Sequence, residues 1–178
     1  MPIEPEKINE IARKFGTSLM DVGIKMIQSA YTNLKPTKVT FSFIQNAVTN
    51  AGLTTPIVQL DSNYFVTNWG QWEIIKDTSL VDKMIYYNEQ FDCDNFSYLF
   101  SSLAALLFKL NSCGATYGAV YDNKTKVLIA YHYFNLIVTD DGKLYCYESM
   151  NDGWCLVEKG KPIIINEWEY RPLKVYYY

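Results

Sequence analysis

The chain has 178 residues, the length of one domain or of one domain with a small appendage. Apolar residues make up 49% of it and charged residues 20%, which excludes a disordered chain. Lys and Arg total 16 against 19 Asp and Glu, so a net charge of −3 gives no overall attraction to nucleic acid or anionic lipid. A single His excludes a metal site built from two or three histidines of one chain.

The cysteines and the apolar stretches bear on the compartment. The four cysteines show no CxxC spacing, so neither a zinc ribbon nor a thioredoxin-type motif is expected. The start of the chain lacks the pattern of a signal peptide, and the longest apolar stretch, residues 99–108, is too short to span a membrane. We therefore expect a cytoplasmic protein with free thiols.

The first part of the chain is predicted to be helical. Residues 5–34 carry apolar side chains at helical spacing on both sides of Gly16, which resembles a helix-turn-helix. Residues 1–40 hold six basic and four acidic side chains, a poor surface for phosphates, so DNA binding is not the preferred interpretation. A further helix is predicted over residues 41–50. We assign residues 1–52 to a helical N-terminal subdomain.

The rest of the chain is predicted to combine one long helix with many strands. Two short strands at 56–60 and 64–67 precede weakly helical sequence, and a strongly apolar helix covers 93–110. Later strands are predicted over residues 116–121, 127–139, 143–148, 163–165 and 173–178. This order indicates an α+β fold, with residues 53–178 as the second domain and the two parts forming one compact unit.

Cys93 is the candidate nucleophile. It lies at the first turn of the long apolar helix, between Asp92 and Asp94. The positive end of a helix dipole and its unpaired N–H groups favour a thiolate and can stabilise an oxyanion. The two aspartates oppose a thiolate unless they cap the helix. The alternative is a buried, inert cysteine next to a capping aspartate.

His132 and Glu148 are the candidate general base and orienting carboxylate. His132 lies within a predicted strand, downstream of the helix that begins with Cys93. A three-residue turn ending at Gly142 pairs residue 139 with residue 143 and puts both side chains on one face of the sheet, ~7–8 Å apart at the backbone. A structural histidine and an exposed glutamate at a strand end are the alternatives.

These motifs resemble the papain-like and transglutaminase-like cysteine peptidase superfamily. The run Asp92-Cys93-Asp94-Asn95-Phe96, then His132-Tyr133-Phe134-Asn135, then Leu144-Tyr145-Cys146-Tyr147-Glu148 is most similar to the C-terminal protease domain of Marasmius oreades agglutinin-type, lectin-related proteins. The resemblance covers roughly residues 85–155. It implies a papain-like fold, a Cys93–His132–Glu148 triad and calcium-dependent proteolysis, although the sequence itself requires no cofactor.

An oxyanion side chain is harder to assign. Gln90 precedes Cys93 by three residues, whereas papain-like enzymes place a glutamine several residues further upstream. Trp72 is the second candidate because transglutaminase-like sites use a tryptophan. The alternative for Trp69 and Trp72 is a role in the core.

The preferred function is therefore a cysteine peptidase or amidase that forms a thioester acyl-enzyme with a protein or peptide substrate. Transfer to an amine, as in a transglutaminase, stays open. The alternative is a non-catalytic binding or structural protein of the same fold that uses its surface aromatics, among 15 Tyr and 4 Trp. Nucleic acid and membrane are not expected as partners, and the C-terminal run Tyr176-Tyr177-Tyr178 could seat a homodimer.

Overall fold

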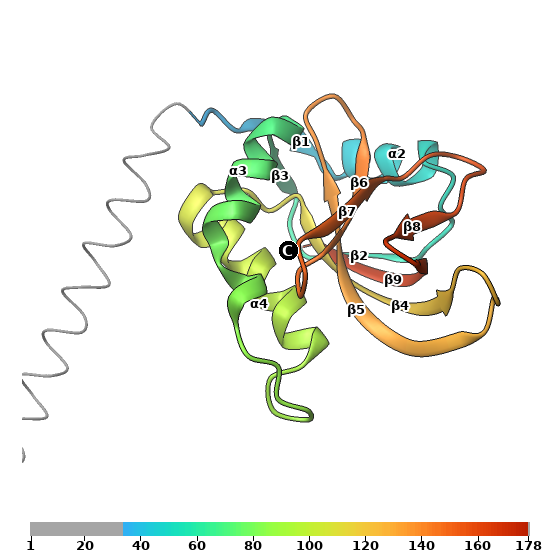
Figure 1. Cartoon of the computed structure of the whole chain (residues 1–178). Helices are drawn as coiled ribbons and strands as arrows, with labels where there is room; N and C mark the ends of the chain where they lie inside the picture. The colour runs from blue at the N-terminus through green and yellow to red at the C-terminus, as the bar shows by residue number, and fades with distance from the viewer. Residues whose placement is uncertain (1–33, 178) are drawn as a thin grey trace, which may run out of the picture. The chain divides into compact units, whose positions relative to one another are not determined.

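Three α-helices and nine strands occur within residues 34–177, the part of the chain that the computed structural model describes (Figure 1). The helices are α2 (Phe41–Asn50), α3 (Trp69–Ser79) and α4 (Cys93–Phe108), with a short 3-10 helix, η1 (Val81–Lys83). The strands are β1 (Thr37–Thr40), β2 (Ile57–Gln59), β3 (Asn63–Val66), β4 (Cys113–Asp122), β5 (Leu128–Val138), β6 (Leu144–Glu148), β7 (Gly153–Leu156), β8 (Ile163–Ile165) and β9 (Trp168–Tyr177).

The predicted α+β class is confirmed. The helices expected over 41–50 and 93–110 are α2 and α4, and each later predicted strand has a counterpart in the sheet. Strands β1 and β7 were not predicted. Strand β9 begins at Trp168, well before the predicted start at residue 173. The strand can include Pro172 because this residue lies at a register shift opposite β4, where its missing N–H is tolerated. The helices predicted over 5–34 lie outside the described residues.

Most strands belong to one sheet of mainly antiparallel pairs. Its order is β2-β9-β4-β5-β6-β7, with β8 paired to β9, and β1 and β3 form a separate two-stranded ribbon. Only β2 and β9 run parallel among the strand pairs of residues 34–177. Strands β7 and β8, from opposite sides of the strand order, contact each other. The sheet therefore curls toward an open barrel, as the curved β4–β5 hairpin in Figure 1 shows.

The turn between β5 and β6 has the predicted three-residue form. Val138 is paired with Leu144, and the Thr139 N–H donates to the Lys143 carbonyl. Gly142 has a φ of +74°, the left-handed conformation that this turn requires. Continued along the strands, this register places Glu148 across from Phe134. The predicted register is confirmed.

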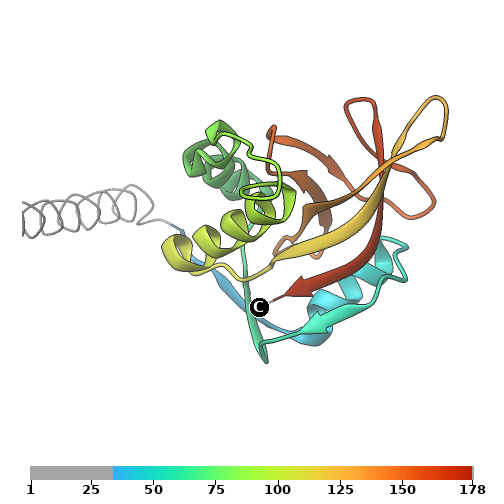
Figure 2. The same cartoon turned by 90° about the horizontal axis from the view of Figure 1, so that it is seen from below.

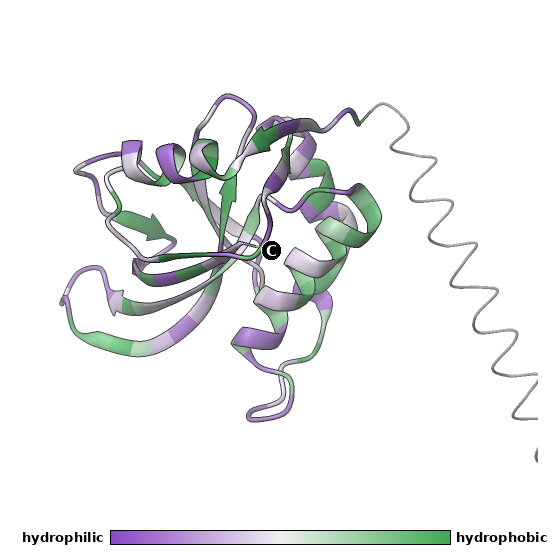
Figure 3. Cartoon of the chain, turned by 180° about the vertical axis from the view of Figure 1, so that it is seen from behind, coloured by the Kyte–Doolittle hydropathy of each residue, from purple (hydrophilic) through white to green (hydrophobic). Residues whose placement is uncertain are grey.

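The core lies between the curled sheet and helix α2. Figure 3 shows apolar residues concentrated on the strands in the middle of the sheet and along the helices beside it. Buried members of the core come from α2, from β3 and from β4, β5, β6, β8 and β9. They include Ile44, Tyr64, Phe134, Leu136 and Tyr177, each no more than 1% exposed.

Helices α3 and α4 lie together on one side of the sheet, apart from α2 (Figure 2). Trp72 of α3 packs on Phe100 of α4, which packs on Tyr147 of β6 at a centroid separation of 4.5 Å. The chain divides into residues Met1–Leu34 and Lys35–Tyr178. Residues 35–52 therefore belong with the sheet, although they precede the boundary expected after residue 52.

No helix within residues 34–177 is long and apolar enough to cross a bilayer. The cytoplasmic location stays a prediction.

Candidate functional site

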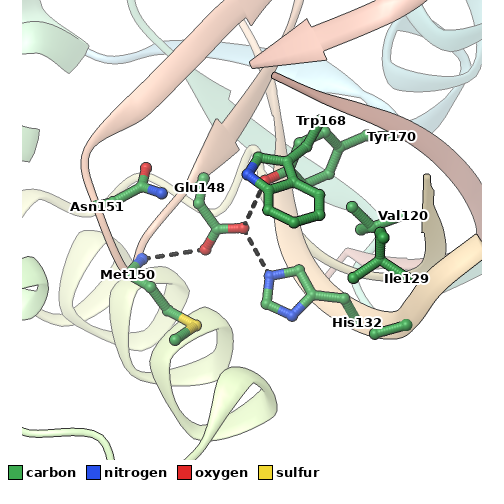
Figure 4. A pocket seen from close by; sticks show the side chains of 9 residues that line it. Val120, Ile129, His132, Glu148, Met150, Asn151, Trp168 and Tyr170 are labelled. Atoms are coloured by element: carbon green, nitrogen blue, oxygen red, sulfur yellow. Dashed lines mark hydrogen bonds and ion pairs between the residues drawn. The ribbon is translucent and has the colours of Figure 1, made fainter. Parts of the chain in front are cut away.

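The imidazole of His132 and the carboxylate of Glu148 are in contact across neighbouring strands of the sheet. His132 lies on β5 and Glu148 at the end of β6, and His132 Nε2 is 2.6 Å from Glu148 Oε2 (Figure 4). Glu148 is only 2% exposed. The contact follows from the β5–β6 register, which puts both side chains on one face as diagonal neighbours.

Two further donors hold the Glu148 carboxylate. The Tyr170 hydroxyl of β9 donates to Oε2 over 3.1 Å, and the Met150 N–H donates to Oε1 over 3.1 Å. Both carboxylate oxygens are therefore engaged, as the dashed lines in Figure 4 show. A buried carboxylate needs such partners because its desolvation is costly.

Cys93 is the first residue of α4, and the structure brings it next to His132. The cysteine is half-buried and free. Two buried hydrogen bonds fix the start of α4 on β5, from the Ser97 hydroxyl to the Phe134 carbonyl (2.9 Å) and from the Asn135 amide to the Ser97 carbonyl (3.0 Å). These contacts, which the sequence did not reveal, set the position of the thiol relative to the imidazole.

His132 carries the charge of this group. Burial lowers the pKa of its imidazole, but hydrogen bonds with the Cys93 and Glu148 side chains and the charges of both outweigh burial and raise the pKa to about 9. His132 is therefore an imidazolium at neutral pH. Because Nε2 bonds to Glu148, the other ring nitrogen, Nδ1, is the one left for Cys93.

The two aspartates beside Cys93 are tied to each other and to the helix start. Asn95 Oδ1 accepts from the Asp92 N–H over 3.1 Å, and Asp94 Oδ1 accepts from the Asn95 N–H over 2.9 Å. A hydrogen bond with the Asp92 side chain, together with burial, raises the pKa of Asp94.

A pocket of about 220 Å³ opens beside His132. Its walls combine apolar side chains with a few polar ones: Val120, Ile129, Ala130, His132, Glu148, Met150, Asn151, Trp168 and Tyr170. Figure 4 shows the Trp168 indole, the Met150 side chain and the His132 ring arranged around the Glu148 carboxylate. The Asn151 Oδ1 accepts from the Gly153 N–H over 2.9 Å, which leaves its NH₂ group to donate.

Trp168 and Tyr170 supply the aromatic side chains of the pocket other than the His132 ring, and the sequence analysis missed both. Both belong to the part of β9 that precedes Pro172, where no strand was predicted. The alternation of Trp168, Glu169 and Tyr170 after the apolar run 163–165 was the available signal of a hairpin.

The two oxyanion candidates lie in different surroundings. Gln90 is exposed, in the turn that precedes β-bridge residue Phe91, where its N–H donates to the Tyr87 carbonyl over 3.1 Å. Trp72 is fully buried in α3, and its indole N–H has no hydrogen-bond partner. Trp72 thus lies in the core, as the alternative reading expected, and an oxyanion role for either residue stays a prediction.

Tyrosines also gather outside the pocket, on the face of β4 and β5 beside α4. Tyr117 lies between Tyr131 and Tyr133, with centroid separations of 5.8 and 5.4 Å, and Tyr133 contacts Tyr98 of α4 at 5.7 Å. Tyr131 is 59% exposed. The C-terminal tyrosines differ, because the Tyr177 ring is buried in the core. The predicted homodimer stays a prediction.

The resemblance to the agglutinin-type protease domain implied calcium. Within residues 34–177 no group of three or more His, Cys, Asp or Glu side chains could hold a metal ion. Calcium binding stays a prediction.

Comparisons with known proteins give a fold and no family. No protein-family model and no curated protein matches the chain. Solved structures do match. The Polyporus squamosus lectin bound to the human-type influenza-binding epitope Neu5Aca2-6Galb1-4GlcNAc has a TM-score of 0.56, 17% identity, and covers 79% of this chain. A PSL1a–E64 complex has a TM-score of 0.54, 17% identity and the same coverage.

This chain spans about half the length of those proteins, 49% and 51% respectively. At 17% identity the likeness establishes a shared fold. A shared fold does not show that this chain has the lectin's glycan site, since one fold hosts many different functional sites.

These findings correct the identification drawn from the sequence motifs. The chain is not supported as a member of the papain-like and transglutaminase-like cysteine peptidase superfamily, because no family model matches and the similar structures are lectin structures. The same findings contradict the predicted cysteine peptidase or amidase function and the assignment as an enzyme. They do not support a protein or peptide substrate. Only the relation to agglutinins is compatible with the comparisons. Short motifs at a helix start and along two strands specify local geometry, and local geometry alone does not specify a reaction.

Proposed function

We propose that this chain is a non-catalytic binding module that holds a single sugar ring of a glycan in the pocket beside His132. The observation that carries the proposal is the composition of that pocket, which pairs the aromatic faces of Trp168 and Tyr170 with the polar groups of His132, Glu148 and Asn151. A pyranose has apolar C–H faces and a rim of hydroxyls. Aromatic faces pack on the former, and a few fixed polar groups bind the latter.

The division of polar groups suits a ligand rich in hydroxyls. Glu148 is satisfied by His132, Tyr170 and the Met150 N–H, so it orders the pocket and leaves little acceptor capacity for a ligand. The Asn151 NH₂ group is free to donate. The imidazolium of His132 adds a positive charge, which favours hydroxyl oxygens and a carboxylate substituent.

The volume supports a ligand of one ring. Pockets that enclose drug-sized ligands occupy ~300–1,000 Å³. The pocket here has about 220 Å³. The remaining sugars of a longer glycan would then lie outside it, near the exposed Ile129 and Asn151.

The finer description of the fold is also a proposal. A helix with Cys93 at its N-terminus packs on an antiparallel sheet that carries His132 and Glu148, and we describe this as a papain-like arrangement used for binding. The fold shared with a lectin that binds Neu5Aca2-6Galb1-4GlcNAc supports a glycan as the ligand class.

Titration with that trisaccharide, followed by calorimetry and saturation-transfer NMR, tests the binding proposal. Wild-type protein is expected to bind it or its component sugars, and Trp168→Ala is expected to weaken binding about tenfold, because an aromatic contact of ~1.5 kcal/mol corresponds to that factor.

Trp154→Ala is the matched control. Trp154 is 41% exposed and packs on Trp69 at 4.6 Å, outside the pocket, so its loss should leave sugar binding unchanged. An absence of binding by the wild type, equal binding by the Trp168→Ala variant, or conversion of the ligand into a product would each contradict the proposal.

We further propose that Cys93, with His132 and Glu148, is a reactive thiol at the edge of this site. The His132 imidazolium is hydrogen-bonded with the Cys93 side chain. A cation beside a cysteine increases the reactivity of its sulfur. Glu148 in turn stabilises the imidazolium. Cys113 and Cys146 are fully buried, and burial raises the pKa of both thiols, which keeps them protonated.

Alkylation with iodoacetamide tests this second proposal. The Cys93 thiolate displaces iodide, so that one S–C bond forms as the C–I bond breaks. Peptide mass mapping should find Cys93 labelled first, and His132→Ala should slow this labelling at least tenfold without changing that of Cys155. Labelling of all four cysteines at one rate, unchanged in the variant, would refute it. Because PSL1a forms a complex with E64, protection of Cys93 by E64 offers a second readout.

A further inference from the structure

Two cysteines outside this thiol–imidazole group face each other across neighbouring strands. Cys146 of β6 is the direct partner of Cys155 of β7, and both are free thiols. The Val157 N–H donates to the Leu144 carbonyl, two residues along from this pair. Because hydrogen-bonded and non-hydrogen-bonded pairs alternate in an antiparallel ladder, Cys146 and Cys155 occupy a hydrogen-bonded pair.

That position lies within the range from which a disulfide can form. The Cα atoms of a hydrogen-bonded antiparallel pair are ~5.5 Å apart, inside the ~4.4–6.8 Å found across disulfides. The Cβ atoms of directly opposite residues are ~4.5–5.5 Å apart, slightly more than a relaxed disulfide requires. A bond between them therefore needs only a small approach of the two strands, and the resulting strain makes it easy to reduce.

The pair lies on the inner side of the sheet, directly beyond the pocket. Cys146 is two residues before Glu148 on β6, so both side chains point to the same face. Cys146 belongs to the core and Cys155 packs against it as a half-buried residue. Burial raises the pKa of Cys146 well above its usual range and that of Cys155 to about 11, so both stay protonated at neutral pH and react slowly.

We propose that Cys146 and Cys155 form a reversible intramolecular disulfide when the protein meets a peroxide. The more accessible Cys155 sulfur attacks the peroxide, and its thiol becomes a sulfenic acid as one water leaves. The Cys146 sulfur then attacks the Cys155 sulfur, the S–S bond forms, and a second water leaves. Two thiols are oxidised, one hydrogen peroxide is reduced, and two water molecules account for the atoms.

The bond would also reach the pocket. Drawing β6 toward β7 at residue 146 would displace Glu148, two residues further along β6. The hydrogen bonds of its carboxylate with His132 and Tyr170 would then be disturbed. We therefore expect oxidation to weaken sugar binding, a consequence that rests on the proposed function, whereas the disulfide itself does not.

Hydrogen peroxide treatment of the full-length Cys93→Ser protein, followed by intact mass spectrometry, is the experiment. The expected result is the loss of two hydrogen atoms per chain, reversed by dithiothreitol. Trypsin leaves both cysteines on the peptide 144–159, and a glutamate-specific protease then cuts after Glu148, between them. The two fragments should stay linked without reductant and separate with it.

Cys113→Ser, a change at a buried cysteine outside the pair, should leave the mass loss intact, and Cys155→Ser should abolish it. Recovery of Cys146 and Cys155 as unlinked thiols or as separate oxygenated acids would overturn the proposal. So would a link from either residue to Cys113. If the Cys155→Ser protein does not fold, protease mapping of the oxidised Cys93→Ser protein alone shows whether Cys146 and Cys155 are linked. This result does not depend on sugar binding.

Discussion

At the scale of single residues, the pocket depends on one buried carboxylate and the groups around it. Glu148 is 2% exposed, and an imidazolium, a phenol and a backbone N–H all bond to its carboxylate. Burial and the nearby Glu148 raise the pKa of Tyr170 far beyond the physiological range, so the phenol remains a donor. Each partner therefore has one stable protonation state at neutral pH, with His132 the first to change.

The raised pKa of His132 predicts a pH-dependent stability. Since the folded-state pKa is about 9 and the ordinary pKa of a histidine is 6.5, its contribution is complete below pH 6.5 and is lost as the pH rises through 9. That difference corresponds to about 3 kcal/mol at most. Urea unfolding at pH 6 and pH 9.5 should show this loss in the wild type and a much smaller one in His132→Gln. Equal losses in the two proteins would show that His132 has no raised pKa.

At the scale of elements, the β5–β6 turn determines which residue meets His132. A turn one residue shorter would place Glu148 on the opposite face of the sheet. Gly142 permits the longer turn through its φ of +74°, and an added Cβ there would meet only Phe43 Cζ at 3.7 Å, an ordinary contact. The cost of replacing it is therefore one of backbone conformation.

Gly142→Ala should lower the free energy of unfolding by ~1–2 kcal/mol, the cost of a left-handed conformation for a residue with a Cβ. Gly160→Ala should cost a similar amount, because its φ is +77° and nothing lies within 4 Å of the added Cβ. Gly70 lies in α3 without a positive φ, and Gly70→Ala should be neutral or stabilising. Chemical denaturation of the three variants would refute this account if Gly142→Ala matched Gly70→Ala.

At the scale of the whole molecule, the sheet needs α2 as a cover. Ile44, Ala47 and Val48 of α2 are buried in the same cluster as Phe134 and Leu136 of β5. A curled sheet exposes its inner face unless another element packs on it. In contrast, the start of β5 carries exposed apolar residues, visible as a green stretch of the curved strand in Figure 3.

Ile44→Ala should therefore destabilise the protein by ~2–4 kcal/mol, the usual cost of emptying a core site. Ile85 is 67% exposed, and Ile85→Ala should change the free energy of unfolding by less than ~0.5 kcal/mol. Thermal and chemical unfolding of this pair compares the same deletion in two environments. A similar, small effect at both sites would mean that residues 35–52 do not belong to the core of the sheet.

The sequence by itself determined the features that depend on neighbouring residues. The apolar spacing of α4, the place of Cys93 in its first turn and the Gly142 turn could be predicted because helix hydrogen bonds and turn conformations are local. The turn then gave the diagonal placement of His132 and Glu148, since strand register follows from turn length.

Only the tertiary structure decided what surrounds those residues. Trp168 and Tyr170 reach the pocket through the pairing of β9 with β4, two strands that lie far apart in the sequence. Which strands pair across such sequence separations is set by burial and chain closure over the entire unit, which no short motif encodes. The motifs around Cys93 were therefore sufficient to predict a geometry and insufficient to predict a function, because ligand preference depends on the complete pocket wall.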